Sequence, residues 1–260
     1  MNRRTFLKAV PAAVLAVAAP RLTRAAETSS GNAPVSTRSA ATSPASTQAA
    51  SAPSIGDLKV IELVKPDTDG GKSVLAALVE RKTIRSIGEQ KLPPQMLSNL
   101  LWAAFGINRE KGPGNQVGRT AASASNSQEI DIYVALPEGV YLYEAAGHKL
   151  TPVVSGDQRA KAGRGRGGAG AKAPVRLIYV ADIAKFAKSR MQEPGLRDPD
   201  IQKSYYCIDA GLIAGNVYLF AASQGLAAWF HNCDKEGIAK LLNLRPDQRV
   251  LYGHTVGYPA

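Results

Sequence analysis

The sequence has few of the residues that bind metals or cross-link small proteins. Its 260 residues include two cysteines, Cys207 and Cys233, and three histidines, His148, His231 and His254. These side chains show none of the short spacings typical of zinc sites, so the sequence does not favour a metalloprotein. One disulfide is the most that two cysteines can form, and sequence spacing leaves open whether they pair or remain buried thiols.

The first apolar run of the chain is too short to span a bilayer as a permanent helix. This run, residues 9–20, holds only 12 residues, whereas a membrane-spanning helix needs about 20. It follows Arg3 and Arg4 and precedes small residues around Ala26, the order of an export signal. Paired arginines resemble the address that the twin-arginine export machinery recognises. We therefore expect a twin-arginine-type signal peptide over residues 1–26 and a periplasmic or otherwise exported protein; an uncleaved membrane anchor is the alternative.

Residues 27–54 contain almost no large apolar side chains and are rich in serine, alanine, threonine and proline. Such a segment cannot bury enough surface to offset the entropy cost of ordering, so we expect a disordered linker. The folded part is then residues 55–260, the usual size of one domain. Without the signal's five cations, the net charge of +11 falls to +6. For an exported protein this charge favours phosphate groups or an anionic membrane surface, and we expect no nucleic-acid partner.

A run of small polar side chains leads into a predicted strand within residues 119–136. Ser123, Ser125, Asn126 and Gln128 crowd the first half, and apolar residues alternate through the second half, the period of a half-buried strand. Short hydroxyl and amide side chains can approach a flat polar ligand closely and bond to its nitrogen and oxygen atoms. A Ser/Asn-rich turn explains the same residues when they are considered alone.

A basic cluster follows a short predicted helix over residues 74–80. Arg81, Lys82, Thr83 and Arg85 combine three positive charges with a hydroxyl group. Together they can clamp a phosphate through charge attraction, bidentate guanidinium bonds and a hydroxyl donor. A solvated basic helix end, which also suits the helix dipole, is the alternative.

The second half of the chain is organised around a long helix predicted over residues 204–223, with Asp209 as a candidate N-cap. This helix is apolar almost all round, which is typical of a central helix or a dimer helix. Gly225, after it, permits close approach of a backbone amide to a ligand and equally suits a helix C-cap. The Gly/Arg-rich residues 159–172 are expected to have no packed structure.

The remaining patterns predict two further helices and a set of short strands. Helices are expected over residues 93–106 and 235–244, and strands over residues 58–64, 130–136, 140–143, 173–182, 226–231 and 250–256.

Taken in order, these segments resemble the flavin-dependent nitroreductase superfamily, and most of all its branch related to thiazoline and oxazoline oxidases. The resemblance covers about residues 58–259 and implies an α+β fold with a mixed, mostly antiparallel central sheet flanked by helices, in an intertwined homodimer. No single stretch is specific, but the ordered set is. It consists of VLAALVERKTIRSI, LSNLLWAAFGINR, GRTAASASNSQEIDIYVAL, GVYLYEA, APVRLIYVAD, DAGLIAGNVYLFAASQGLA and QRVLYGHTVGYP.

The resemblance also implies FMN at the subunit interface. It implies that the basic cluster contacts the phosphate and pyrimidine ring, that the serine-rich loop reaches the flavin from the other subunit, and that a backbone amide after the long helix faces flavin N5. The residues concerned are Arg81, Lys82, Thr83 and Arg85, then Ser123, Ser125, Asn126 and the adjacent Gln128, and finally Gln224, Gly225 and Leu226.

The implied activity is that of an exported FMN-dependent oxidoreductase, which passes hydride through flavin N5 between a donor and a small-molecule substrate. NAD(P)H is one candidate donor, although nicotinamide cofactors are scarce outside the inner membrane. No catalytic side chain is expected, since the protein positions the ring and tunes its potential. One alternative is a non-catalytic flavin- or ligand-binding protein of the same fold, and another is an envelope interaction protein that works through residues 159–172.

One departure from the family concerns the phosphate. The family's basic residues usually follow the Gly-x-Pro segment, whereas here that segment is followed by Ala260, which leaves Arg245 and Arg249 as candidates.

Overall fold

The computed structural model describes residues 54–163 and 172–260. The predicted signal peptide, nearly all of the predicted linker and residues 164–171 of the Gly/Arg-rich segment lie outside the described residues. Residues 50–260 belong to one compact unit.

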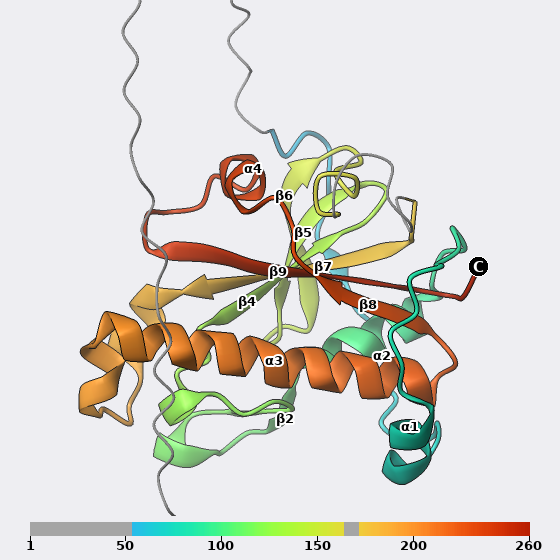
Figure 1. The fold of residues 1–260 in the computed structure, drawn as a ribbon. Coiled ribbons are helices and arrows are strands. Elements are labelled where there is room, and N and C mark those ends of the chain that lie inside the picture. Colours follow the sequence, from blue (N-terminus) through green and yellow to red (C-terminus); the bar gives the residue numbers. More distant parts are fainter. Residues whose placement is uncertain (1–53, 164–171) are drawn as a thin grey trace, which may run out of the picture. The chain divides into compact units, whose positions relative to one another are not determined.

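A seven-stranded sheet forms the centre of this unit (Figure 1), in the order β1-β6-β5-β4-β7-β9-β8. All six neighbouring pairs within the described residues are antiparallel, which confirms the expected α+β fold with a mostly antiparallel sheet. The strands are β1 (Ile61–Glu62), β4 (Ile130–Ala135), β5 (Gly139–Glu144), β6 (Lys149–Ser155), β7 (Val175–Asp182), β8 (Ala227–His231) and β9 (Gln248–Gly257), with β2 (Ile107–Arg109) and β3 (Gly118–Arg119) forming a separate ribbon.

The inner strand β7, between β4 and β9, is buried along its whole length because helices cover both faces of the sheet. Successive side chains of a strand point to opposite faces. Leu177 and Tyr179 accordingly join the core beneath α2 (Pro94–Phe105) and α3 (Pro199–Ser223). Ile178 and Val180 join a second core beneath α4 (Lys235–Leu241). The continuous apolar run of this strand is therefore explained by burial on both sides.

The long helix α3 begins five residues earlier than predicted, at Pro199. Its N-cap is Asp198, whose side chain accepts hydrogen bonds from the backbone N–H groups of Asp200 at 2.9 Å and Ile201 at 3.3 Å. An aspartate followed by proline is a strong helix start. The prediction of Asp209 as the N-cap was wrong: this residue is buried in the middle of the helix.

Two other predictions need correction. The strand predicted over residues 58–64 shortens to β1, and β6 was missed because its Pro152 and polar residues weaken the strand pattern. The start of the Gly/Arg-rich segment is packed rather than structureless: Arg159 pairs with Asp157 at 2.7 Å and donates to the Ala173 carbonyl at 2.9 Å, and Ala162 is buried. Cys207 and Cys233, whose pairing the sequence left open, are free thiols.

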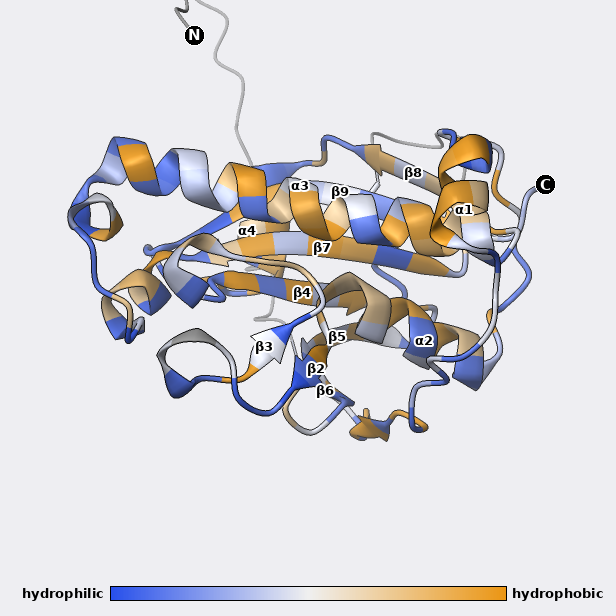
Figure 2. Cartoon of the chain, turned by 90° about the horizontal axis from the view of Figure 1, so that it is seen from below, coloured by the Kyte–Doolittle hydropathy of each residue, from blue (hydrophilic) through white to orange (hydrophobic). Residues whose placement is uncertain are grey.

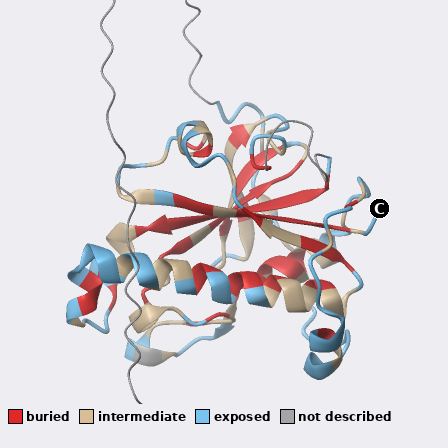
Figure 3. Cartoon of the chain, viewed as in Figure 1, coloured by how far each residue is buried: buried red, intermediate tan, exposed pale blue. Residues whose placement is uncertain are grey.

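Helices α1 (Val74–Glu80) and α3 carry apolar side chains that face away from the core. Val79, Leu75 and Leu78 of α1 are 87%, 76% and 51% exposed, and Ile208 and Leu212 of α3 are exposed as well. Figure 2 shows the hydrophobic colouring of α1, and Figure 3 shows that the same helix is almost wholly exposed. These side chains form an uncovered apolar surface of this chain.

Among the described residues, α3 alone is long and apolar enough, by length and composition, to cross a membrane. Its inner side packs on the sheet through buried residues such as Ile213 and Val217. Because one side of α3 is buried against the sheet, α3 is a central helix of the fold, as predicted.

Candidate functional site

The basic cluster (Arg81, Lys82, Thr83 and Arg85) lies along the free edge of the sheet. Helix α1 ends at Arg81, and the chain then runs beside the edge strand β8 (Figure 1). The Ile84 backbone N–H donates to the Ala228 carbonyl of β8 at 3.1 Å, and Ile87 forms a bridge with Pro259. These bonds cover part of the edge and fix the backbone of the cluster.

Two aromatic rings support the arginines of the cluster. The guanidinium carbon of Arg81 lies 5.6 Å from the centre of the Tyr218 ring, and that of Arg85 lies 5.9 Å from the Trp229 ring. The described residues provide no carboxylate partner for the three cations of the cluster. All four side chains are exposed, so their positive charge is available to an anion.

The turn after α3 presents an open stretch of backbone close to this cluster. Gly225 has a φ of +69°, exposed backbone and no atom within 4 Å of the position that a Cβ would occupy. The buried Leu226 donates its N–H to the Ala221 carbonyl at 2.8 Å, which closes the helix end. The glycine thus serves as a left-handed helix cap, and it also leaves room for a ligand to approach the main chain.

The polar loop (residues 123–128) is strained and firmly held. Ser125, Asn126 and Gln128 have φ values of +48°, +51° and +51°, a conformation that persists only where surrounding contacts enforce it. The Gln128 side chain accepts from Arg119 Nε at 2.7 Å and donates to the Val117 carbonyl at 2.8 Å. Gln128 is therefore engaged within the loop itself.

Two further bonds hold the same loop. The Ser123 hydroxyl oxygen accepts from the Gln128 N–H at 3.0 Å, and the Ser125 carbonyl accepts from the Ser189 hydroxyl at 2.6 Å. Both bonds fix the backbone on which the small polar side chains sit.

A buried carboxyl pair anchors the loop to α3. The Asp209 carboxylate accepts from the Ala124 N–H at 2.8 Å, and the fully buried Glu129 accepts from the Ser127 hydroxyl at 2.6 Å. Burial, followed by the neighbouring Glu129 charge, raises the pKa of Asp209 to about 8. The sequence signal for this anchor is a single aspartate inside an apolar helix.

The structure does not bring all the predicted site residues together within one chain. Asp209, which holds the polar loop, and Tyr218, whose ring supports Arg81 of the basic cluster, are nine residues apart on one helix. At 1.5 Å per residue this separates the two groups by roughly 14 Å along the helix axis. Arg245 and Arg249 lie at the far end of β9 from Gly257, roughly 27 Å away in an extended strand, and Arg245 pairs with Asp182 at 2.8 Å.

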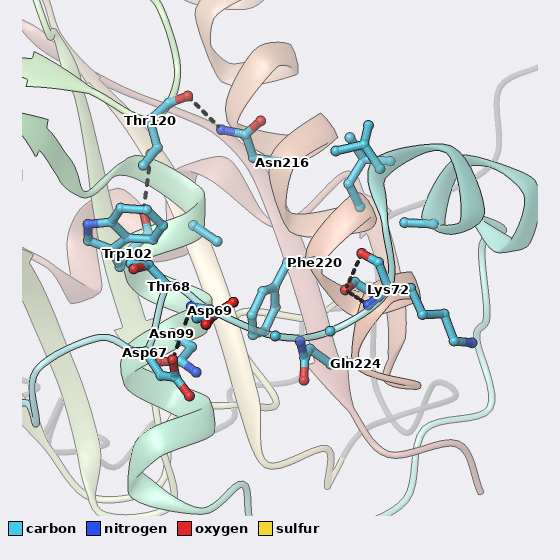
Figure 4. Close-up of a pocket in the computed structure, with 17 residues that line it drawn as sticks. Asp67, Thr68, Asp69, Lys72, Asn99, Trp102, Thr120, Asn216, Phe220 and Gln224 are labelled. Carbon is cyan, nitrogen blue, oxygen red and sulfur yellow. Dashed lines mark hydrogen bonds between the residues drawn. The ribbon is translucent and has the colours of Figure 1, made fainter.

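Sequence reasoning missed a cavity of about 530 Å³ between α2, α3 and residues 67–74 (Figure 4). Its lining combines Trp102 and Phe220 with Asp67 and Asn216. Of the predicted site residues, Gln224 alone reaches it. The sequence signal for this cavity is the glycine pair at positions 70 and 71.

The Gly-Gly segment (residues 67–72) that borders the cavity is bound to the end of α3. Ser223 Oγ accepts from the Lys72 N–H at 2.8 Å and donates to the Lys72 carbonyl at 3.3 Å. A Cβ on Gly71 would lie 2.4 Å from that Oγ, so only glycine fits there. No group of three or more metal-binding side chains occurs among the described residues.

The fold and the site define a class: an α+β protein with an antiparallel sheet, a long central helix and an exposed basic cluster at the sheet edge. The chain belongs to the Nitroreductase family, which matches residues 78–258, from α1 to the end of β9. Family membership places it among oxidoreductase folds.

Individual relatives agree with this assignment. A candidate nitroreductase of Methanocaldococcus jannaschii is 29% identical over 181 residues, which cover 66% of this chain and 83% of that protein. The crystal structure of a candidate nitroreductase from Ralstonia eutropha JMP134 has a TM-score of 0.68 and 33% identity, covering 80% of this chain and 94% of that one. The Escherichia coli microcin synthetase McbBCD complex shares the fold alone, with a TM-score of 0.54, 16% identity, and coverage of 82% and 84%.

Proposed function

We propose that this protein is an exported, homodimeric, FMN-dependent oxidoreductase of the branch related to thiazoline and oxazoline oxidases. The observation that carries the proposal is the exposed basic cluster, which has no carboxylate partner in the described residues, together with the open Gly225 backbone at the end of α3. An unpaired cation cluster and an approachable main-chain donor are what a phosphate-bearing redox cofactor requires.

The residues present fit FMN in charge and in space. Arg81, Lys82 and Arg85 would hold the phosphate, and Thr83 would add a hydroxyl donor. The backbone of Gly225 can come close to a flat ring because no atom lies within 4 Å of its missing Cβ. Bound FMN would supply two-electron redox chemistry, and the protein would contribute a fixed N–H donor where negative charge develops.

The homodimer is supported by the two separated groups of site residues. The polar loop and the basic cluster are held by Asp209 and Tyr218, which lie roughly 14 Å apart along α3, and the family resemblance implies that the loop reaches the flavin from the other subunit. A second copy that covers the exposed apolar side chains of α1 and α3 would place the loop of one subunit near the cluster of the other. Burial of Leu75 and Val79 in such an interface would also stabilise the dimer.

The reaction partners follow from family and expected location. We propose a small-molecule acceptor, with NAD(P)H or a directly oxidised substrate as the electron donor.

Export would require the paired arginines near the start of the chain, and it fits a route that carries folded, cofactor-loaded proteins. Cell fractionation of the protein with Arg3 and Arg4 replaced by lysine tests the export: retention in the cytoplasm supports it, and unchanged export contradicts it.

The test of the enzyme proposal is the absorbance spectrum of the purified protein, with the released cofactor identified. We expect a yellow protein with close to one FMN per subunit, whose visible absorbance bleaches with an electron donor and returns with an acceptor. A colourless protein that cannot be reconstituted with FMN would overturn the proposal. Bound FMN that no donor bleaches would leave a non-catalytic flavin-binding protein.

A further inference from the structure

Tyr218 on α3 connects three parts of the proposed phosphate site. Its ring lies under the Arg81 guanidinium, at 5.6 Å from ring centre to the guanidinium carbon. Its hydroxyl lies 3.0 Å from Thr83 Oγ1 and accepts a hydrogen bond of 3.0 Å from the Phe230 N–H of β8. One side chain therefore contacts the basic cluster twice and ties it to the sheet edge.

The direction of the bond between Tyr218 and Thr83 follows from counting protons. The Phe230 N–H can only donate, so it occupies an acceptor position on the Tyr218 oxygen. The single proton of Tyr218 then needs an acceptor, and within the described residues Thr83 Oγ1 is the one in contact. If Tyr218 donates, Thr83 keeps its own proton for another acceptor, and Thr83 is exposed.

The arginines on either side of Thr83 are held in a matching way. Arg81 and Arg85 lie over the rings of Tyr218 and Trp229. A ring attracts a cation without neutralising its charge, in contrast to a carboxylate. The two rings thus restrict both guanidinium groups and leave their donors free for an anion.

We propose that Tyr218 is a positioning residue of the phosphate site. It turns the Thr83 hydroxyl outward as a donor and, together with Trp229, holds the arginines ready for a phosphate monoester. This inference rests on the proposed FMN function, because FMN carries that phosphate and riboflavin does not. Tyr218 itself acts through Thr83 and Arg81.

The test measures dissociation constants of the apoprotein for FMN and for riboflavin by flavin fluorescence. Tyr218→Phe keeps the ring and removes the hydroxyl. We expect about a tenfold loss of FMN affinity, the effect of one hydrogen bond to a charged group, and unchanged riboflavin affinity. Tyr218→Leu, which also removes the ring, should lose more. Tyr252→Phe is the matched control. The Tyr252 ring also lies under a cation, Lys235 Nζ at 5.4 Å from the ring centre, but neither residue belongs to the basic cluster.

A double-mutant cycle separates positioning from general support. Thr83→Val should weaken FMN binding about as much as Tyr218→Phe, and the double variant should lose little more, because both changes remove the same oriented donor. Thr83→Ser should restore the affinity. Thr83 is exposed, so substitutions there should leave the fold intact. The Thr83 variants therefore report on FMN binding even if Tyr218→Phe does not fold.

The outcomes distinguish the two proposals. Wild-type protein that binds neither FMN nor riboflavin would overturn the proposed function, and this inference with it. Wild-type protein that binds FMN would leave the function in place, and the inference alone would then be overturned by any of three results. These are unchanged FMN affinity in Tyr218→Phe, equal losses for FMN and riboflavin, or additive losses in the double variant.

Discussion

The buried carboxyl group of Asp209 lies close enough to that of Glu129, beneath the polar loop, for the Glu129 charge to add to burial in raising the pKa of Asp209. Two carboxyl groups in contact cannot both be ionised at low cost, so the pair retains a proton at neutral pH. Asp209 also accepts a hydrogen bond from the Ala124 N–H. This bond links the protonation of the carboxyl pair to the strained backbone of the loop.

Replacing Asp209 by asparagine should flatten the pH dependence of stability. The folded pKa of Asp209, about 8, is above its value in an unfolded chain, about 3.9. Its stabilising contribution is therefore complete below about pH 4 and is lost as the pH rises through 8. Urea unfolding between pH 6 and 9 should show that wild type loses up to about 1.4 kcal/mol per pH unit relative to Asp209→Asn. Equal slopes would contradict this, and the exposed Asp57→Asn is the control.

His254 should make the protein less stable in acid. Burial, followed by the nearby His231, lowers the pKa of His254 to about 3, below the unfolded value of about 6.5. Between these values the unfolded chain binds the extra proton, so stability falls as the pH drops, at about 1.4 kcal/mol per pH unit. His254→Gln keeps a polar partner for Tyr179, which lies 3.0 Å from His254 Nδ1. The variant should lack this part of the slope between pH 6 and 4 in urea unfolding, and an unchanged slope would refute the assignment.

Gly71 and Gly70 form a matched pair for testing the Gly-Gly segment. Both have positive φ values, +75° and +121°, but only at Gly71 would a Cβ collide, at 2.4 Å from Ser223 Oγ. Alanine at either position should cost about 1 kcal/mol for the backbone, and Gly71→Ala about 1–3 kcal/mol more for the collision. Thermal unfolding measures the difference. Adding Ser223→Ala should recover part of the extra loss, whereas equal effects at the two glycines would exclude the collision.

Val79→Glu should dissociate the proposed dimer without unfolding the subunit. The side chain is 87% exposed in one chain, so a charge there costs the monomer little, whereas burial of that charge in an interface is unfavourable. Light scattering after size-exclusion chromatography should give a dimer for wild type and a monomer for the variant. Val60→Glu, at another exposed apolar residue, should remain dimeric. A dimeric Val79→Glu would place the interface elsewhere.

The sequence by itself determined the family and most of the elements. Alternation predicted β4 and β9, a continuous apolar run predicted β7, and the helical period predicted α2 with its end at Gly106. These signals are local, because the periods of strands and helices are written into neighbouring residues. The basic cluster was visible in the same way, since its residues are adjacent in the chain.

Only the tertiary structure decided which residues meet. Tyr218 and Trp229 lie more than 130 residues from the arginines that they support, and nothing local in an apolar helix marks one tyrosine as a partner of Thr83. Likewise, an aspartate inside α3 looks like a cap until the fold places Glu129 beside it. Contacts of this kind depend on how β8, α1 and α3 pack together, and that packing is set by the shared burial of many side chains rather than by any pattern within one segment.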